Sequence, residues 1–576
     1  MNSSHEDLEH KHHSLAHLLA AAVLELWPDA KRAIGPAIEN GFYYDFGDLK
    51  ITDADLPKIE KAMRKILPTW HSFEKKAIEA NEAKELFRDN PYKLELIEEY
   101  EKDGLTTYTS GEYVDLCRGG HSLEIDPQSF KLTHIAGAYW RGSEKNAMLT
   151  RIYGVAFDTK AELDAYLAMM EEAKKRDHKV LGPKLDLFVF SDLVGAGLPL
   201  WTPRGTLLRN TLDDFVWSLR RMRDYEKVEI PHITKKELYE TSGHWEKFKN
   251  ELFRITTREG HEFAMKPMNC PHHTQIYARR QWSYRELPQR YANTTMCYRD
   301  EQSGELAGLS RTRSFAQDDA HVFCRMAQAK DEFLKVWDIV HEFYGAFGFT
   351  LRVRLSLHDP DQMEKYLGEV DRWNEAEGML RQIVEEKKAD FFEGVGEAAF
   401  YGPKLDFMAK DSIGREWQVA TIQLDMNMPE RFDLTCINES GEKERIVMIH
   451  AAIMGSIERF LSIAIEHFAG AFPLWLAPVQ VAVLPISEKH AEEASKVTEY
   501  LKTLGLRAEL HDQNESIGKK IRTAEMMKIP YLFIMGDKEV AEKKIAVRKR
   551  GGEDLGAQDP MAFIARMQEE IRSKAL

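Results

Sequence analysis

The sequence predicts a multidomain protein that combines α+β and α/β architecture. The chain has 576 residues, and at about 150 residues per domain this length corresponds to three or four domains. In residues 185–472, β-prone segments follow one another without regular crossover helices, which is typical of a largely antiparallel sheet. In residues 476–576, strands and helices alternate, which indicates a small parallel α/β domain.

Composition narrows the class of protein. The contents of 43% hydrophobic and 30% charged residues are ordinary for a soluble globular protein. No apolar run reaches spanning length, and the start MNSSHEDLEHKHH is too polar for a signal or transit peptide, so we expect a cytoplasmic protein without a membrane segment. A net charge of −15 argues against non-specific coating of nucleic acid, although a local basic patch could still bind RNA. The five scattered cysteines argue against a disulfide framework and leave packing, metal binding or reactivity.

The first region opens with the segment HHSLAHLLAAAVLELW, residues 12–27, which predicts an amphipathic helix. His13 and His17 are four residues apart and share one helical face. Cys117 and His121 are also four apart and enclose a Gly-Gly pair. The two pairs together supply four side chains that could bind a tetrahedral zinc ion. The spacing leaves open whether they hold a metal or hydrolyse a substrate through a positioned water.

Domain boundaries follow from helical periodicity and breaker residues. Residues 161–178 have helical periodicity with mixed charge, and the Gly-Pro pair at Gly182 follows them. We therefore expect a first domain with a helical linker over residues 1–181. A second domain over residues 182–475 and a third over residues 476–576 complete the chain.

The second domain begins with a predicted helix over residues 202–225 and a strand, VEIPHI, that ends at Pro231. The segment EFAMKPMNCPHH predicts a strand and a loop that carries Cys270. Near its end, a strand passes through Gly455 into a helix that carries Arg459. Neither a GxGxxG nor a Walker A sequence is present, so any ATP must be held in another way.

The stretch Met296–Cys324 predicts two strands joined by a polar loop. Because side chains alternate along a strand, Gln317, Asp319 and His321 should share one face. Arginines such as Arg311 in the loop suit phosphate, since their planar fork donates two hydrogen bonds and stays charged. The stretch is therefore a candidate nucleotide site, and the alternative is a hairpin whose charges simply face water.

Three segments resemble, in this order, the motifs of class II aminoacyl-tRNA synthetases: the strand at Pro231, the arm from Tyr298 to Glu301 with its return strand, and the turn from Gly455 to Arg459. More narrowly, KPMNCP, QDDAH and the segment around His450 are similar to the threonyl-tRNA synthetase family. The HxxxH and CxxxH pairs resemble the editing domain of that family. The match spans nearly the whole chain. It implies an α+β editing domain, an antiparallel-sheet catalytic domain and a C-terminal α/β anticodon-binding domain.

The resemblance also implies an activity. Such an enzyme activates threonine with ATP and Mg²⁺, transfers it to tRNA(Thr), and forms a homodimer through the motif that contains Pro231. One Zn²⁺ in each catalytic domain would bind the amino and hydroxyl groups of threonine. Valine lacks the hydroxyl, and an apolar pocket alone distinguishes a methylene-sized difference by only about 1–3 kcal/mol. Serine would pass this test, so a second site should hydrolyse seryl-tRNA. The alternatives are a class II synthetase for another amino acid and a catalytically silent RNA-binding relative.

The resemblance assigns roles residue by residue. The catalytic residues are Arg299, His244, Lys404 and Arg459. ATP is bound by Arg299, Glu301, Arg311, Gln418 and Arg459, and the amino acid or adenylate by Gln317, Asp319, Tyr401 and Gln423. The zinc ligands are Cys270, His321 and His450. The editing residues are His13, His17, Cys117, His121, Asp115, Lys93 and Tyr44. The anticodon is read by Asn514, Glu539 and Arg548.

The sequence departs from the family pattern at four points. The family commonly has another small domain before the editing helix, whereas this sequence begins almost at that helix. The segment after Cys117 is RGGH where RGPH is usual. In the synthetase loop, Ala307 and Ser314 stand where His and Gly are usual. These departures bear on editing and on ATP contacts and leave the zinc triad intact.

Overall fold

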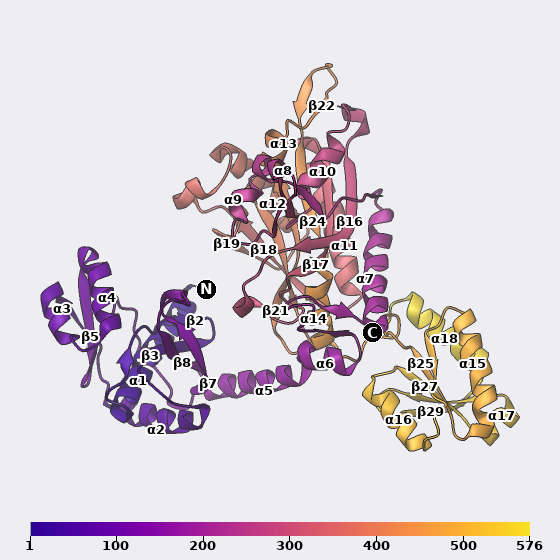
Figure 1. The fold of residues 1–576 in the computed structure, drawn as a ribbon, viewed down its shortest axis with the longest axis horizontal. Coiled ribbons are helices and arrows are strands. Elements are labelled where there is room, and N and C mark those ends of the chain that lie inside the picture. The colour runs from indigo at the N-terminus through magenta and orange to yellow at the C-terminus, as the bar shows by residue number, and fades with distance from the viewer. Residues whose placement is uncertain (1) are drawn as a thin grey trace. The chain divides into compact units, whose positions relative to one another are not determined.

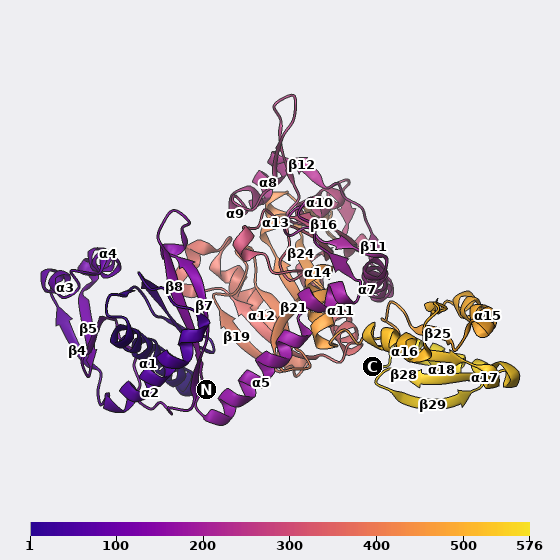
Figure 2. The same ribbon diagram turned by 60° about the horizontal axis from the view of Figure 1, so that its bottom comes forward.

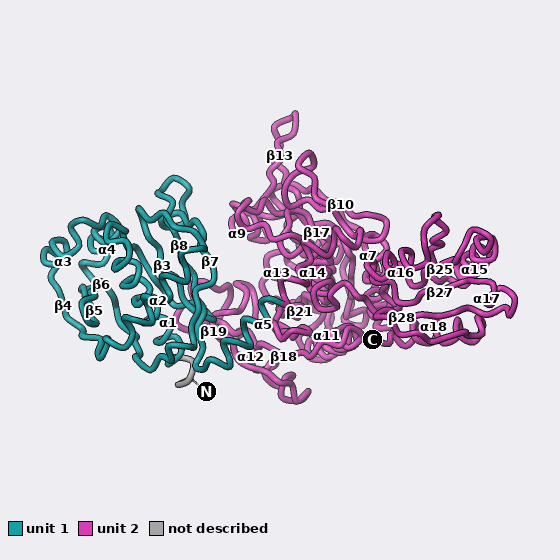
Figure 3. The backbone as a smooth tube through the Cα atoms, turned by 90° about the horizontal axis from the view of Figure 1, so that it is seen from below, with its two compact units in different colours: residues 1–171 teal, residues 172–576 magenta. Residues whose placement is uncertain are grey.

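The computed structural model describes residues 2–576, with side chains from residue 7 onward. The chain divides into two compact units, and the division falls between Glu171 and Glu172 inside helix α5, Lys160–Arg176 (Figure 3). Within residues 2–576, no helix has both the length and the apolarity that a membrane crossing requires.

Unit 1 is an α+β unit with two sheets. Its helices are α1 Asn2–Leu26, α2 Leu56–Ile66, α3 Ala80–Leu86 and α4 Pro91–Tyr100. The larger sheet has the order β1-β3-β8-β7, with β2 paired to β3, and its strands are β1 Lys31–Arg32, β2 Ala37–Ile38, β3 Gly41–Gly47, β7 Phe130–Tyr139 and β8 Met148–Ala156. The smaller sheet consists of β4 Glu74–Ile78, β5 Leu105–Ser110 and β6 Tyr113–Leu116.

Helix α1 is the central element of unit 1. Its apolar positions, among them Leu15, Leu19 and Val23, are buried together with Phe42 and Phe46 of β3. Helices α1 and α2 lie beside the larger sheet (Figure 2). Since His13 and His17 lie on the same helix, packing of α1 against the sheet fixes the position of both imidazoles.

Unit 2 contains the long antiparallel sheet that the sequence predicts. Its order is β11-β16-β17-β24-β21-β20-β18-β19, and only the two outermost pairs are parallel. The strands are β11 Glu226–Lys227, β16 Gln289–Tyr298, β17 Ser314–Cys324, β18 Thr350–Leu357, β19 Phe391–Val395, β20 Lys404–Lys410, β21 Glu416–Asp425 and β24 Val447–Ala452. The expected class of fold is confirmed.

Helices cover one face of this sheet (Figure 1). Alternate residues of the central strands, such as Val322 and Ile449, enter the main core with the apolar face of α11. The helices of this part are α6 His178–Lys184, α7 Pro203–Arg221, α8 Lys236–Ser242, α9 His244–Lys247, α10 Cys270–Tyr277, α11 Met326–Gly345, α12 Val370–Glu386, α13 Asn427–Arg431 and α14 Ile457–His467. The opposite face carries the polar residues of the same strands, and α10 and α13 pack against part of it, where Tyr291, Phe323 and Met448 form a second apolar cluster.

Short strands complete this part of unit 2. They are β9 Phe188–Val189, β10 Leu200–Trp201, β12 Ile233–Lys235, β13 Arg254–Thr256, β14 Glu262–Met265, β15 Trp282–Ser283, β22 Thr435–Ile437 and β23 Lys443–Arg445.

The C-terminal part of unit 2 has a five-stranded sheet of order β26-β25-β27-β28-β29, with helices on both faces. The elements are β25 Val481–Pro485, α15 Ala491–Thr503, β26 Ala508–Leu510, α16 Ile517–Met526, β27 Tyr531–Met535, α17 Asp537–Glu542, β28 Ile545–Lys549, β29 Glu553–Gln558 and α18 Pro560–Arg572. The expectation of a parallel sheet was only half right. The pairs β25–β26 and β25–β27 are parallel, but β28 and β29 form an antiparallel hairpin because no crossover helix separates them.

Two local predictions were wrong. The segment VEIPHI, residues 228–233, does not form the expected strand: β11 ends before it at Lys227, and only Ile233 belongs to a strand, as the first residue of β12. The fixed backbone of Pro231 lies between the two strands. Cys270 opens helix α10 instead of lying in a loop, and Pro271 occupies the first turn, where its missing N–H has no cost.

Candidate active sites

The polar face of the long sheet borders a cavity of about 340 Å³. Cross-strand register aligns Tyr291, His321, His450, Gln423 and Lys404 in one row, each directly opposite the next. Residues directly opposite in antiparallel strands point to the same side, so the row gathers on one face. The alternation that predicted a common face for Gln317, Asp319 and His321 is confirmed, since all three line this cavity.

The cavity brings together many of the residues that the sequence singled out. These are Arg299, Gln317, Asp319, His321, Tyr401, Gln418, Gln423, His450 and Arg459. Pro267, Met268, Cys297, Thr421 and Met454 also line it, and sequence reasoning missed them. Thr421 could have been found, because it precedes Gln423 by two residues on the same strand and therefore shares its face.

Three donor groups converge beside the cavity, and two of them, His321 and His450, line it. The ligand atoms of Cys270, His321 and His450 all lie within 4.8 Å of one another, and His321 Nε2 is 3.1 Å from His450 Nδ1. All three residues are buried. Burial raises the pKa of the Cys270 thiol and lowers the pKa of His321. Imidazole nitrogen and thiolate sulfur are donors that zinc prefers, so the set fits such an ion.

Two arginines, Arg299 and Arg459, also form part of the cavity wall. The Arg299 guanidinium lies 5.1 Å from the ring centre of Phe248 and 5.4 Å from that of Phe315, and its Nε has no partner within the described residues. Arg459 lies in the first turn of α14, where Ser456 Oγ accepts its backbone N–H at 3.1 Å. Both guanidinium groups border the cavity, and within the described residues neither forms an ion pair with a carboxylate.

Five of the singled-out residues do not line the cavity: Cys270, which lies behind His321 and His450, and four others. Glu301 and Arg311 form an ion pair with 2.7 Å between Arg311 Nη2 and Glu301 Oε2. Lys404 donates to the carboxylate of Asp406. His244 is fully buried, with Nε2 3.6 Å from Cys270 Sγ, and burial lowers its pKa to about 3, so the ring is neutral at physiological pH.

Asp406 is a supporting residue that sequence reasoning missed. Its fully buried carboxylate accepts hydrogen bonds from Lys404 and Arg354 and, at 2.8 Å each, from Ser356, Gln418 and Thr421. The hydrogen bond from Arg354 is 2.9 Å long. A single acceptor thus orients two of the singled-out side chains, Lys404 and Gln418.

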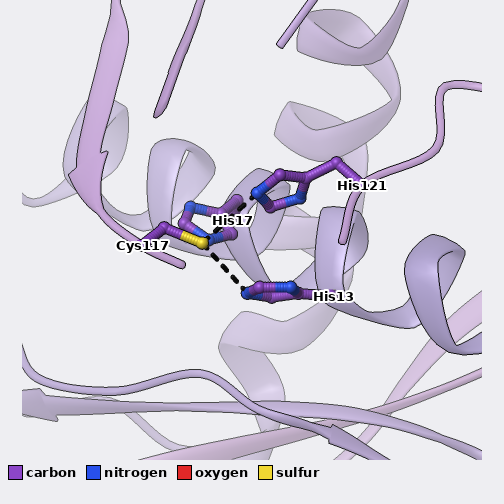
Figure 4. Close-up of side chains that lie close together, drawn as sticks. All are labelled: His13, His17, Cys117 and His121. Atoms are coloured by element: carbon purple, nitrogen blue, oxygen red, sulfur yellow. Dashed lines mark hydrogen bonds between the residues drawn. The ribbon is translucent and has the colours of Figure 1, made fainter. Parts of the chain in front are cut away.

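The second site lies in unit 1, where α1 meets the loop after β6. Cys117 Sγ is 3.5 Å from His13 Nε2 and 3.3 Å from His121 Nε2, and His17 lies beside them (Figure 4). Burial raises the pKa of Cys117 to about 11 and lowers the pKa of His121 to about 3, and it lowers the pKa values of His13 and His17 as well. At neutral pH the set therefore contains a thiol and three neutral imidazoles.

The loop geometry depends on Gly120. Its φ is +82°, and the carbonyl of Gly120 lies 3.1 Å from His13 Nδ1. Proline cannot adopt this φ. The RGGH sequence therefore gives the loop a conformation that the usual RGPH could not share.

A buried ion pair supports the second site. Lys93 Nζ is 2.7 Å from Asp115 Oδ1, and Asp115 Oδ2 accepts the hydroxyls of Tyr44 at 2.6 Å and Tyr113 at 2.8 Å. Burial by itself would raise the pKa of Asp115, but Lys93 and Arg32 outweigh it and hold this pKa below its ordinary value. Tyr44, Lys93 and Asp115 line a cavity of about 390 Å³ together with His13, His17 and Cys117.

The three residues expected at the anticodon lie on separate elements of the C-terminal part. Asn514 is exposed in the segment between β26 and α16. Glu539 lies in α17, where its Oε2 accepts the N–H of Gly536 at 3.1 Å. Arg548 lies on β28, and its Nη2 donates to Gly552 O at 3.3 Å.

Comparison with known proteins finds close relatives over the whole chain. The tRNA synthetase class II core domain (G, H, P, S and T) family matches residues 253–468, and the anticodon binding domain family matches residues 480–570. The threonine--tRNA ligase of Bacteroides fragilis is 49% identical, with 99% of this chain and 90% of the relative covered. That of Thermotoga maritima is 48% identical, with 98% and 88% covered.

Two solved structures have a similar fold. One is the RNA binding domain of threonyl-tRNA synthetase from Cryptosporidium parvum Iowa II, with a TM-score of 0.65, 37% identity, and 68% of this chain and 98% of that chain covered. The other is a putative threonyl-tRNA synthetase, ThrRS-1, from Aeropyrum pernix, with a TM-score of 0.62, 30% identity, and 69% and 97% covered.

Proposed function

The chain belongs to the threonine--tRNA ligase family, and from this membership we propose how its two clusters of side chains divide activation and editing between them. The enzyme uses ATP to activate threonine and transfers the product to tRNA(Thr). The observation that carries the assignment of the first site is the shared cavity. It has Asp319, His321 and His450 in its wall together with Arg299 and Arg459.

In this cavity the protein mainly orients the two substrates. The threonine carboxylate must attack the α-phosphate in line, so positioning and neutralisation of negative charge supply the rate. We assign Arg299 to the α-phosphate and the carboxylate, and Arg459 to the γ-phosphate. Glu301, Arg311 and Gln418 hold other parts of the nucleotide, which binds with Mg²⁺, and Lys404 approaches the reacting phosphate once it leaves Asp406.

The part of the cavity that we assign to the amino acid contains one carboxylate and several neutral polar side chains. Asp319 accepts the amide N–H of Asn269 at 3.1 Å, which leaves its other oxygen for the threonine side chain. Gln317, Tyr401 and Gln423 border the same space. Cys270, His321 and His450 would hold a zinc ion, which when bound supplies a Lewis acid for the amino and hydroxyl groups of threonine. His244, neutral at physiological pH, would assist transfer to the tRNA.

Pyrophosphate exchange tests this assignment. With zinc present, exchange should occur with threonine and serine and not with valine, because only the first two amino acids carry the hydroxyl. Cys270→Ser should lose both stoichiometric zinc and exchange. Failure of the zinc-loaded protein to exchange with threonine would refute the assignment, and exchange with valine at the threonine rate would refute the role of zinc in selection.

We propose that the cluster in unit 1 hydrolyses seryl-tRNA. The cluster consists of the Cys117 thiol and the imidazoles of His13, His17 and His121 around it. These imidazoles are neutral, so they can accept a proton from water. Lys93, Asp115 and Tyr44 form the polar wall of the same cavity. Such a cavity fits the small hydroxylated side chain of serine. Zinc-based selection cannot exclude serine, so seryl-tRNA is the product that needs hydrolysis.

Single substitutions test the editing assignment. His13→Ala or Cys117→Ala should let seryl-tRNA accumulate, while threonine-dependent pyrophosphate exchange in unit 2 stays unchanged. Hydrolysis of purified seryl-tRNA with and without a chelator then separates metal-dependent hydrolysis from a positioned water. Equal breakdown of seryl-tRNA by the wild type and both variants would remove these residues from editing.

Two further proposals concern partners. The segment before α7 exposes apolar side chains, with Leu193 exposed at 99% and Phe190 at 42%. Such a patch is typical of a protein interface, so we propose a homodimer through this segment and the motif that contains Pro231. Leu193→Asp should shift the sedimentation coefficient to that of a monomer.

Asn514, Glu539 and Arg548 are proposed to read the anticodon, and their alanine variants should raise KM for tRNA without changing exchange.

A further inference from the structure

Helix α10 carries a histidine, His273, that contacts the proposed zinc ligand His321. Cys270 opens the helix, and His273 follows one turn later on the same side. His273 Nδ1 lies 2.8 Å from His321 Nδ1, and the two buried rings are nearly perpendicular, at 89°. One helix thus contributes both a metal ligand and a contact to the ring of another ligand.

The outer nitrogen of His450 has a different partner. His450 Nε2 lies 3.0 Å from Asp425 Oδ2, and the other oxygen of Asp425 accepts the backbone N–H groups of Asn427 and Met428 at 2.8 Å each. A carboxylate only accepts hydrogen bonds, so His450 carries its proton on Nε2. Its Nδ1 therefore presents a lone pair toward His321 and Cys270.

The tautomer of His321 follows from the same reasoning. A metal ligand needs a lone pair on Nε2, the nitrogen that faces His450 at 3.1 Å. Its proton must then sit on Nδ1, and the one hydrogen-bond partner of that nitrogen among the described residues is His273 Nδ1. His273 must accept this bond, so its own proton lies on Nε2, a buried atom without a partner within residues 2–576.

We propose that His273 is a positioning residue that fixes the ring and the tautomer of His321 for zinc, acting as a neutral counterpart of Asp425. This inference rests on the proposed zinc site. Partners of this kind orient metal-binding imidazoles, and their loss typically weakens metal binding about 10–100-fold. Because imidazole is neutral, His273 orients His321 without adding negative charge. A zinc ion held by these residues would then keep more of its Lewis acidity for the substrate hydroxyl.

The neighbouring residue supplies a matched control. His272 is also buried in α10, but neither of its ring nitrogens has a partner within the described residues. His272→Leu therefore removes a buried imidazole of the same helix without breaking a hydrogen bond to a ligand. We expect its zinc affinity to equal that of the wild type.

Three substitutions at His273 separate hydrogen bonding from volume. His273→Asn keeps an acceptor near the position of Nδ1, His273→Gln moves the amide oxygen toward the position of Nε2, and His273→Leu offers no acceptor. In the full-length chain, chelator competition with Zn²⁺ should give affinities about 10–100-fold below wild type for the Leu and Gln variants and within about threefold of wild type for the Asn variant. The visible absorption of the Co²⁺-loaded protein should change in the same two variants. Thermal unfolding of each metal-free variant checks the fold, and the Asn–Gln comparison decides the matter if the Leu variant does not fold.

The outcomes distinguish the inference from its premise. Wild-type affinity and an unchanged Co²⁺ spectrum in the Leu and Gln variants would overturn the role of His273 and leave the zinc site standing. Equal loss in the Asn and Gln variants would overturn it as well, because volume rather than the acceptor would then matter. A wild-type protein that binds no zinc with Cys270, His321 and His450 would instead refute the proposed metal site, and the inference with it.

Discussion

Substitution of Lys93 by Met tests how much the buried ion pair of unit 1 contributes to stability. The side chains of Lys93 and Asp115 are exposed at only 3% and 1%, so Lys93→Met leaves a buried carboxylate without its principal cation. Breaking such a pair costs about 3–5 kcal/mol. Arg32 Nε remains 3.8 Å from Asp115, and the two tyrosine hydroxyls also remain, so the lower end, about 3 kcal/mol, is expected.

The size of the effect can be measured by calorimetry of the full-length chain. For a unit of this length, 1 kcal/mol corresponds to about 2–4 °C in Tm, so Lys93→Met should lower the Tm of unit 1 by about 6–12 °C. The matched control is Lys76→Met. Lys76 Nζ lies 2.6 Å from Glu82, but the two side chains are exposed at 65% and 54%. Exposed pairs contribute about 0–1 kcal/mol, so this variant should unfold within a few degrees of wild type.

The pH dependence gives a second check. Lys93 lowers the pKa of Asp115 in the folded state, so the folded protein binds fewer protons there than the unfolded chain does. The stabilisation is therefore complete above the unfolded-state pKa of about 3.9 and is lost as pH falls through the folded-state pKa. The difference between wild type and Lys93→Met should be largest near pH 7 and should shrink in strong acid. Equal Tm shifts for Lys93→Met and Lys76→Met at pH 7 would refute the reasoning.

Three other predictions follow from named contacts. Asp406→Asn should lower kcat of pyrophosphate exchange about 10²-fold with zinc content unchanged, because the amide has one accepting oxygen and cannot accept from both Lys404 and Gln418 as the two carboxylate oxygens do; an undiminished kcat would contradict this role. His178 joins Glu466, at 2.6 Å, to the N–H of Leu309, at 3.1 Å, in the loop between β16 and β17 that we propose binds ATP. His178→Leu should raise KM for ATP about tenfold, equivalent to about 1.4 kcal/mol for one lost buried hydrogen bond, whereas exposed Lys179→Ala should not change it. Because burial lowers the pKa of His121 to about 3, against about 6.5 in the unfolded chain, the folded state binds fewer protons and unit 1 should lose stability as pH falls from about 6.5 toward 3. Hydrogen exchange from pH 7 to 5 measures this loss, and His121→Asn should reduce it.

Alternation along strands predicted part of the first site from sequence alone. The common face of Gln317, Asp319 and His321 required only a period of two and is confirmed. The ligand set of His321, His450 and Cys270 came from the resemblance instead, because these residues meet through strand register and through a helix far away in sequence. Register depends on pairing between strands, which one strand's pattern does not contain.

Other differences between expectation and structure have local causes. Cys270 was expected in the loop after a strand, yet it opens a helix, with which proline in the first turn is compatible. The final strands were expected to be parallel, but β28 and β29 follow one another through a short turn. A two-strand hairpin leaves no room for the crossover that parallel pairing requires.

The supporting residues were beyond sequence reasoning for a more general reason. Asp406 is opposite Thr421 and two residues from Lys404, so its face could be deduced, but its five donors come from three strands and converge only after the sheet forms. Asp425 and His273 are similar, since each contacts a proposed zinc ligand carried by a different element. In each case an acceptor holds a functional group in place before any substrate arrives. Folding therefore provides the free energy that orients these side chains, and none has to be spent on them during the reaction. Charges that are already in place stabilise a phosphoryl transition state most effectively.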